Sequence, residues 1–280
     1  MTCAVALVAT LLAAAPAAAQ SLEAVTSEFE AVSGARLLFT RAELGRERWY
    51  TIMMELPPQA RAKAAAIALR EVKRYPPGYL KAIGLRRVGL FAGLAAKTND
   101  GFHEWRRELG GFAYLGMWNH RDGLVAAAYS EEQLVRTLHH EIFHHVDSTR
   151  DGRMDDARHA PQSSAAFAAA LQGRRPYAAI SLGEEELAAL RERATGEPLV
   201  DAASRYCSKS PREDRAETAR WVMAHLPEAL LQAATRPELK GSQRILHVLR
   251  AFELSAKGAP DLGWLRAQAM EQPGRREARQ

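Results

Sequence analysis

Five residues near the middle of the chain, His140-Glu141-Ile142-Phe143-His144, restrict what it can fold into more than any other stretch. On an α-helix, residues four positions apart lie on the same face, so His140 and His144 can offer two imidazole nitrogens to one metal ion. Glu141 projects beside that pair, where a carboxylate can take a proton from a metal-bound water and return it to a leaving amine. The pattern predicts a metal-binding helix with a general base beside the metal.

Two other interpretations of this histidine-rich stretch stay open. Glu141 and His145 share the same four-residue spacing, so they form a second candidate chelate, although that pair would use the base as a ligand. His139 has Phe143 at this spacing and therefore has no metal-binding partner there. The stretch could also be a solvated helix face that binds no metal.

The residues around the motif favour a packed helix. Ser130 is followed three positions later by Gln133, which is the capping-box pattern that starts a helix. Leu134, Leu138 and Ile142 recur at helical spacing and provide one apolar face to bury. The metal-binding pair is therefore predicted to lie on a helix of the core.

Residues 1–19 contain no charged side chain, are mostly apolar, and end in three alanines before the polar Gln20. This pattern is typical of a secretory signal peptide cleaved after Ala19. The apolar run is shorter than the ~20 residues that span a bilayer, so the pattern disfavours a membrane anchor. We expect a secreted or periplasmic protein with no stable membrane insertion.

Composition excludes several classes of protein. Among the 280 residues, a hydrophobic content of 47% and a charged content of 25% are typical of a globular chain with a full core. The net charge is +5, but the basic residues are scattered and not gathered in an aromatic-rich stripe, so nucleic-acid binding is disfavoured. Cys207 is the only cysteine after the predicted signal, which excludes an internal disulfide.

The sequence predicts an α+β fold, dominated by helices, with a small sheet of three to four strands. The expected parts are a signal peptide (1–19), an N-terminal helical segment (20–84), a domain that carries the metal site (85–258) and a C-terminal tail (259–280). Expected helices cover 22–32, 59–74, 164–171 and 184–194 besides the metal-binding helix, and a charged loop covers 148–156. Expected strands cover 36–40, 88–94, 111–118 and 124–129.

A catalytic zinc site needs a third protein ligand and an open position for water. Ser210 and Pro211 start a further predicted helix, on which Glu213 and Glu217 lie four positions apart on one face. One carboxylate could bind the metal, and the other could hold a ligating imidazole through its second nitrogen. Ser210 with Glu213 is also an ordinary capping box, and acidic residues are favoured in any first helical turn, so spacing alone leaves ligation open.

Taken together, these motifs resemble the catalytic domain of the anthrax lethal factor family of zinc peptidases, within the gluzincin group. The likeness covers roughly residues 85–256 and lies in His140, Glu141, His144, Val146, Asp147, Tyr206, Glu213 and Glu217. It implies a zincin-like fold with His140, His144 and Glu213 as ligands of one zinc ion. It also implies that Glu141 is the general base and that Tyr206 donates a hydroxyl to the oxyanion.

Two further expectations concern the site, and the chain departs from the family in two respects. Glu217 and Asp147 are expected to lie behind the ligands and to orient them. The edge strand near the zinc helix is expected to pair with an extended peptide. Residues 148–205 show no recognisable likeness to the family, and the toxin's accessory domains have no counterpart in this chain.

We therefore expect an exported zinc metallopeptidase that acts on a peptide or protein substrate. One alternative is a catalytically silent zincin-fold protein that binds zinc or an envelope partner. The presence of Glu141 argues against this alternative, because a silent site has no need of a base. The other alternative is a metal hydrolase that acts on cell-wall peptide amides, which the sequence does not distinguish from a peptidase.

Overall fold

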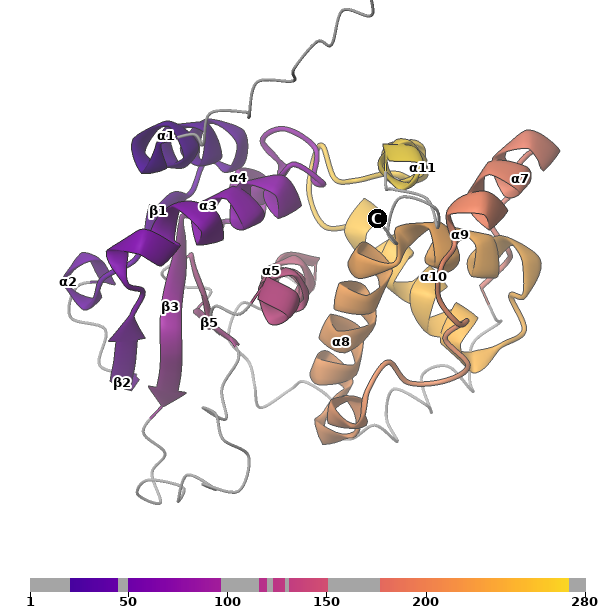
Figure 1. The fold of residues 1–280 in the computed structure, drawn as a ribbon. Coiled ribbons are helices and arrows are strands. Elements are labelled where there is room, and N and C mark those ends of the chain that lie inside the picture. Colours follow the sequence, from indigo (N-terminus) through magenta and orange to yellow (C-terminus); the bar gives the residue numbers. More distant parts are fainter. Residues whose placement is uncertain are drawn as a thin grey trace, which may run out of the picture.

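The computed structural model describes residues 21–44, 50–96, 116–119, 123–128, 131–150 and 177–271. Over these residues helices dominate and one small mixed sheet is present, which confirms the predicted α+β class. Figure 1 shows the sheet at one side of the molecule and the C-terminal helices at the other, with α5 (Glu131–Arg150) between them. The expected signal peptide at 1–19, the strand residues 111–115 and the helix at 164–171 lie outside the described residues.

The N-terminal helices begin and end where local chemistry predicts. α1 (Leu22–Ser33) is capped by Ser21, whose Oγ accepts a hydrogen bond of 3.2 Å from the N–H of Ala24. Gly34 ends it with a φ of 71°, a left-handed conformation that glycine adopts without strain. The other helices of this segment are α2 (Arg41–Leu44), α3 (Pro58–Val72) and α4 (Tyr79–Ala82).

Five strands form one mixed sheet in the order β1-β3-β5-β4, with β2 also paired to β3. They are β1 (Arg36–Leu38), β2 (Tyr50–Glu55), β3 (Arg87–Ala96), β4 (Gly116–Asn119) and β5 (Leu124–Ala128). β3 runs parallel to β1 and β5 and antiparallel to β2, whereas β4 runs antiparallel to β5. β1 and β2 pair with successive parts of β3, residues 87–89 and 91–96, on the edge opposite β5.

The sequence patterns do not predict β2, which lies in the segment 20–84 that was expected to be helical. Its register shifts twice against β3, and the shift between Tyr50 and Ile52 inserts an extra residue into β2, which interrupts the alternation that marks a strand. β1 and β2 together join this segment to the sheet. The main hydrophobic core likewise runs through the whole fold, from Phe29 to Phe252.

The C-terminal half of the described chain is helical. Its elements are α7 (Glu184–Arg193), the short 3₁₀ helix η2 (Arg205–Lys209), α8 (Pro211–Ala224), α9 (Leu226–Thr235), α10 (Lys240–Glu253) and α11 (Leu262–Glu271). α8 packs against α5 and α10, and α11 packs against α9. α11 falls within residues 259–280, where a tail was expected, and it joins the core because Leu265 is 1% exposed. Among the helices of the described residues, none is both long and apolar enough to cross a membrane.

α5 is longer than the sequence patterns indicate. It runs to Arg150, so the loop expected at 148–156 is wrong for its first residues. The reason is contact with α8, because the Arg212 guanidinium donates a hydrogen bond to Oγ of Ser148, which is 2% exposed. The predicted apolar face of this helix is confirmed, since Leu134, Leu138 and Ile142 are fully buried.

The first turn of α10 packs tightly against the segment that leads to η2. A methyl group on Gly241 would lie 1.7 Å from the carbonyl oxygen of Leu199, which is far inside van der Waals contact. We therefore expect Gly241→Ala to lower the free energy of unfolding by about 1–3 kcal/mol, measured by chemical denaturation. Gly183→Ala is the matched control, because its methyl group would meet only Oε2 of Glu186 at 3.6 Å. Equal stability of the two variants would contradict the close packing.

Candidate metal centre

The four histidines of α5 contact three different elements, α3, β5 and α8. His139 Nε2 lies 3.1 Å from Oε2 of Glu71 on α3, and its Nδ1 lies 2.8 Å from the hydroxyl of Tyr75. His145 Nε2 lies 3.3 Å from the carbonyl oxygen of Leu124 in β5. These two histidines thus contact the sheet side of the fold. The structure does not support the alternative chelate of Glu141 with His145.

His140 and His144 face α8 and meet Glu213 there. His140 Nε2 lies 3.2 Å from His144 Nε2 and 3.1 Å from Glu213 Oε2. The third side of this triangle, from His144 Nε2 to Glu213 Oε2, measures 3.6 Å. Ligand bonds of about 2.1 Å in a tetrahedral zinc site separate neighbouring donor atoms by about 3.4 Å. The three atoms are therefore spaced to hold one metal ion.

Glu213 is the third member of this cluster because α8 begins just before it. Ser210 Oγ accepts a hydrogen bond of 3.2 Å from the N–H of Glu213, and Pro211 occupies the first helical position. The Oε2 atom of Glu213 is buried and accepts no regular hydrogen bond from the described residues. The polar atoms nearest to this oxygen are the two imidazole nitrogens, at 3.1 and 3.6 Å, and a cation among the three atoms would satisfy all of them.

Glu217 lies one turn further along α8 and contacts the other ring nitrogen of His140. Its Oε1 is 2.9 Å from His140 Nδ1, as the spacing of the two glutamates predicts. A carboxylate only accepts hydrogen bonds, so Nδ1 carries a proton, and once His140 is neutral its Nε2 presents a lone pair to the cluster. Glu217 thereby selects the tautomer of His140 that can bind a metal.

The buried charges of the cluster perturb one another. Burial lowers the pKa of His140, but contacts with Glu213 and Glu217 outweigh burial and raise this pKa to about 10. Burial lowers the pKa of His144 to about 4 and raises that of Glu141 to about 8. Burial also raises the pKa of Glu213, but its contacts with both histidines hold that pKa well below the usual range. Metal binding must displace the proton of His140, so we expect metal affinity to fall with falling pH.

Tyr206 lies at the exposed side of the cluster, on η2. Its ring centroid is 6.1 Å from that of His140, and 42% of the residue is exposed. The Lys209 ammonium lies 4.3 Å from the centroid of the same ring. The structure thus places this tyrosine beside His140 and open to solvent.

Two aspartates near the cluster, Asp147 and Asp214, form contacts between helices. Asp147, which was expected behind the ligands, accepts a hydrogen bond from Arg215 and so joins α5 to α8. Asp214 follows Glu213 in sequence but points away from the cluster, with its Oδ2 3.1 Å from Nε of Arg244. The Asp147 contact therefore joins the two helices that carry the cluster, whereas the Asp214 contact joins α8 to α10.

Sequence reasoning missed two residues of the site, both of which contact Glu217. Nη2 of Arg220 lies 2.7 Å from Glu217 Oε2, and the Ser204 hydroxyl donates a hydrogen bond to the same oxygen. Arg220 is three residues after Glu217, so helical spacing was a signal for this contact. Ser204 lies in a loop, and no pattern in the sequence marked it.

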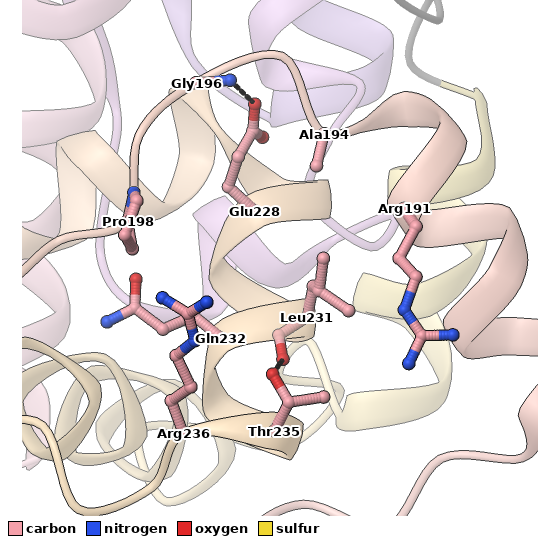
Figure 2. Close-up of a pocket in the computed structure, with 9 residues that line it drawn as sticks. All are labelled: Arg191, Ala194, Gly196, Pro198, Glu228, Leu231, Gln232, Thr235 and Arg236. Carbon is pink, nitrogen blue, oxygen red and sulfur yellow. Dashed lines mark hydrogen bonds between the residues drawn. The ribbon is translucent and has the colours of Figure 1, made fainter.

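The structure also contains a hollow of about 410 Å³ beside α7 and α9, away from the metal cluster (Figure 2). Its lining consists of Arg191, Ala194, Gly196, Pro198, Glu228, Leu231, Gln232, Thr235 and Arg236. The Glu228 carboxylate in this hollow accepts hydrogen bonds from the N–H groups of Thr195 and Gly196. It therefore holds the loop after α7, and we assign the hollow no function.

Comparison with family models, curated proteins and solved structures found no match to this chain. The resemblance to the lethal factor family therefore stays a prediction, based on the motif residues alone. The function has to be argued from the geometry and chemistry of the cluster.

Proposed function

We propose that the protein is a zinc-dependent peptidase whose metal ligands are His140, His144 and Glu213. The observation that supports this most is the triangle of donor atoms, with sides of 3.1, 3.2 and 3.6 Å, formed by two helices that are distant in sequence. Two imidazoles and one carboxylate are the donor set that catalytic zinc sites use, and three protein ligands leave a position open. A zinc ion held there supplies a Lewis acid that polarises a scissile carbonyl and acidifies water.

In this proposal Glu141 is the general base. It follows His140 on α5 and is 6% exposed, and its carboxylate is near enough to His140, Glu213 and Glu217 for their charges to affect its pKa. A carboxylate in this position takes a proton from the attacking water and later returns it to the leaving amine. Tyr206, open to solvent beside His140, donates its hydroxyl to the oxygen of the scissile carbonyl as negative charge develops on it.

The position of the sheet supports a peptide as the substrate. β4 ends the strand order of the described sheet, and both β4 and β5 pack against α5. An extended peptide can add to a sheet edge through main-chain hydrogen bonds, which places its backbone along the metal-bearing helix. With the two ligand-bearing helices α5 and α8, this arrangement supports a zincin-like fold. The apolar, uncharged residues 1–19 support export of the protein.

The first test is the metal itself. We expect purified, folded protein that has never met a chelator to contain about one equivalent of zinc, because one set of three ligands binds one ion. Elemental analysis by mass spectrometry measures the content. Dialysis against a chelator, followed by zinc titration, provides the control. Folded protein that neither contains nor takes up zinc would contradict the proposal.

The second test is the reaction. The zinc-loaded protein is incubated with a diverse peptide mixture and, in a separate arm, with cell-wall peptides, and mass spectrometry identifies new termini. We expect new peptide termini that disappear when zinc is removed. Cleavage of cell-wall amides alone would identify the other hydrolase class. Zinc-loaded protein that cleaves neither substrate would contradict an enzymatic function and favour a zinc-binding or partner-binding role.

A further inference from the structure

The Ser204 hydroxyl connects two parts of the site that the chain brings together from different elements. Ser204 directly precedes η2 in an extended conformation, with φ −161° and ψ 170°. Its Oγ accepts a hydrogen bond of 3.1 Å from the N–H of Tyr206 and donates one to Oε2 of Glu217. A serine hydroxyl has one proton to donate, so this group uses its only donor on the carboxylate.

Each of these bonds leads to a residue of the proposed site. Through Glu217 the hydroxyl acts on His140, because the other carboxylate oxygen, Oε1, lies 2.9 Å from His140 Nδ1. The N–H bond holds the start of the turn that carries Tyr206. Arg220 also contacts Glu217 Oε2, at 2.7 Å, and so supports the carboxylate independently of the hydroxyl. Ser204 and Arg220 both hold the Glu217 carboxylate, but only Ser204 also bonds to the N–H of Tyr206.

We infer that Ser204 is a positioning residue, which sets the Glu217 carboxylate against His140 and holds Tyr206 in place beside the metal. The inference rests on the proposed function, because it assigns Ser204 a role in that site. Catalytic groups must be held within about half an ångström of their working geometry by the residues behind them. One hydroxyl bonded to both the carboxylate and the Tyr206 turn aligns the proposed oxyanion donor with the metal ligand.

The test compares two serines of the same turn. Ser208 is the matched control, because its hydroxyl donates its hydrogen bond to the carbonyl oxygen of Arg205, at 2.8 Å, and not to Glu217 or His140. We expect Ser204→Ala to weaken zinc binding about tenfold, the lower end of the loss for residues behind metal ligands, because Arg220 remains. Ser204→Thr, which keeps the hydroxyl, should restore the affinity. Ser208→Ala should leave it unchanged.

Zinc affinity is measured by competition with a coloured chelator, which needs no substrate. Turnover is measured separately at saturating zinc, so that every variant carries the metal despite its weaker affinity. We expect kcat of Ser204→Ala to stay about tenfold low under these conditions with KM little changed, because the displaced Tyr206 acts in the transition state and not in substrate binding. If Ser204→Ala does not fold, Ser204→Gly replaces it, since glycine is tolerated at the start of a helix.

Two further variants, Glu217→Ala and Tyr206→Phe, separate the effect of Ser204 on zinc binding from its effect on turnover. In Glu217→Ala protein, adding Ser204→Ala should not weaken zinc binding further, because the hydroxyl acts on His140 only through that carboxylate. In Tyr206→Phe protein, adding Ser204→Ala should not lower kcat at saturating zinc. Equal zinc affinity and kcat in the Ser204→Ala and Ser208→Ala proteins would overturn the inference alone. Parent protein that binds no zinc would instead overturn the proposed function.

Discussion

Replacing Glu141 with glutamine should leave the zinc and the fold in place and lower turnover about a hundredfold or more. Glutamine fills nearly the same space in the buried cluster, where Glu141 is 6% exposed, so the helix can keep its packing. Its amide cannot take the proton from water, and the reaction loses its general base. Turnover is measured with a peptide that the parent protein cleaves, and zinc content is measured on the same sample.

Glu185→Gln is the matched control for this change. Glu185 is exposed on α7, so the exchange removes the same charge outside the cluster and should leave turnover unchanged. Parental turnover of Glu141→Gln would mean that another group is the base or that the proposed reaction is wrong. Loss of zinc from Glu141→Gln would mean that Glu141 is a ligand, which would revive its pairing with His145.

The sequence predicted those parts of the fold that depend on neighbouring residues. α1 covers nearly the expected range, from its cap Ser21 to Gly34, and α8 begins at Ser210 and Pro211, because caps and prolines act within one helical turn. β2 was missed because the extra residue between Tyr50 and Ile52 interrupts the alternation that identifies a strand. The packing of α11 through Leu265 depends on α9, which no local pattern reveals.

The same distinction applies to the metal cluster. His140 and His144 were predictable because helical geometry alone brings them together, at 3.2 Å between their Nε2 atoms. The contact of Ser204 with Glu217 requires the loop after α7 to fold back onto α8. That loop is held by contacts between distant residues, such as the 2.7 Å bond from the N–H of Leu199 to Oε1 of Gln232. The spacing of residues in the sequence does not predict such contacts.

Zinc affinity should fall furthest in Glu213→Ala, less in Glu217→Ala and hardly at all in Asp214→Ala. Glu213 supplies one corner of the donor triangle, so its removal should abolish tight binding. Glu217 only orients His140, and loss of such a residue costs about 10- to 100-fold in affinity. Asp214 is turned about 100° around the helix from Glu213 and contacts Arg244 instead. Competition with a chelator measures all three variants.

The stability of the zinc-free variants should follow a different order, which serves as the internal control. Asp214 is 2% exposed, so Asp214→Ala removes a buried partner of Arg244 and should reduce the free energy of unfolding most. The Glu213 side chain is 23% exposed, so its loss should cost the zinc-free protein less than the loss of Asp214, whose side chain is 2% exposed. Of these two adjacent residues of α8, Glu213 would then determine metal binding and Asp214 the stability of the fold. If Asp214→Ala lost the metal while remaining folded, the ligand face of α8 would be assigned wrongly, because no general weakening of the fold explains that result.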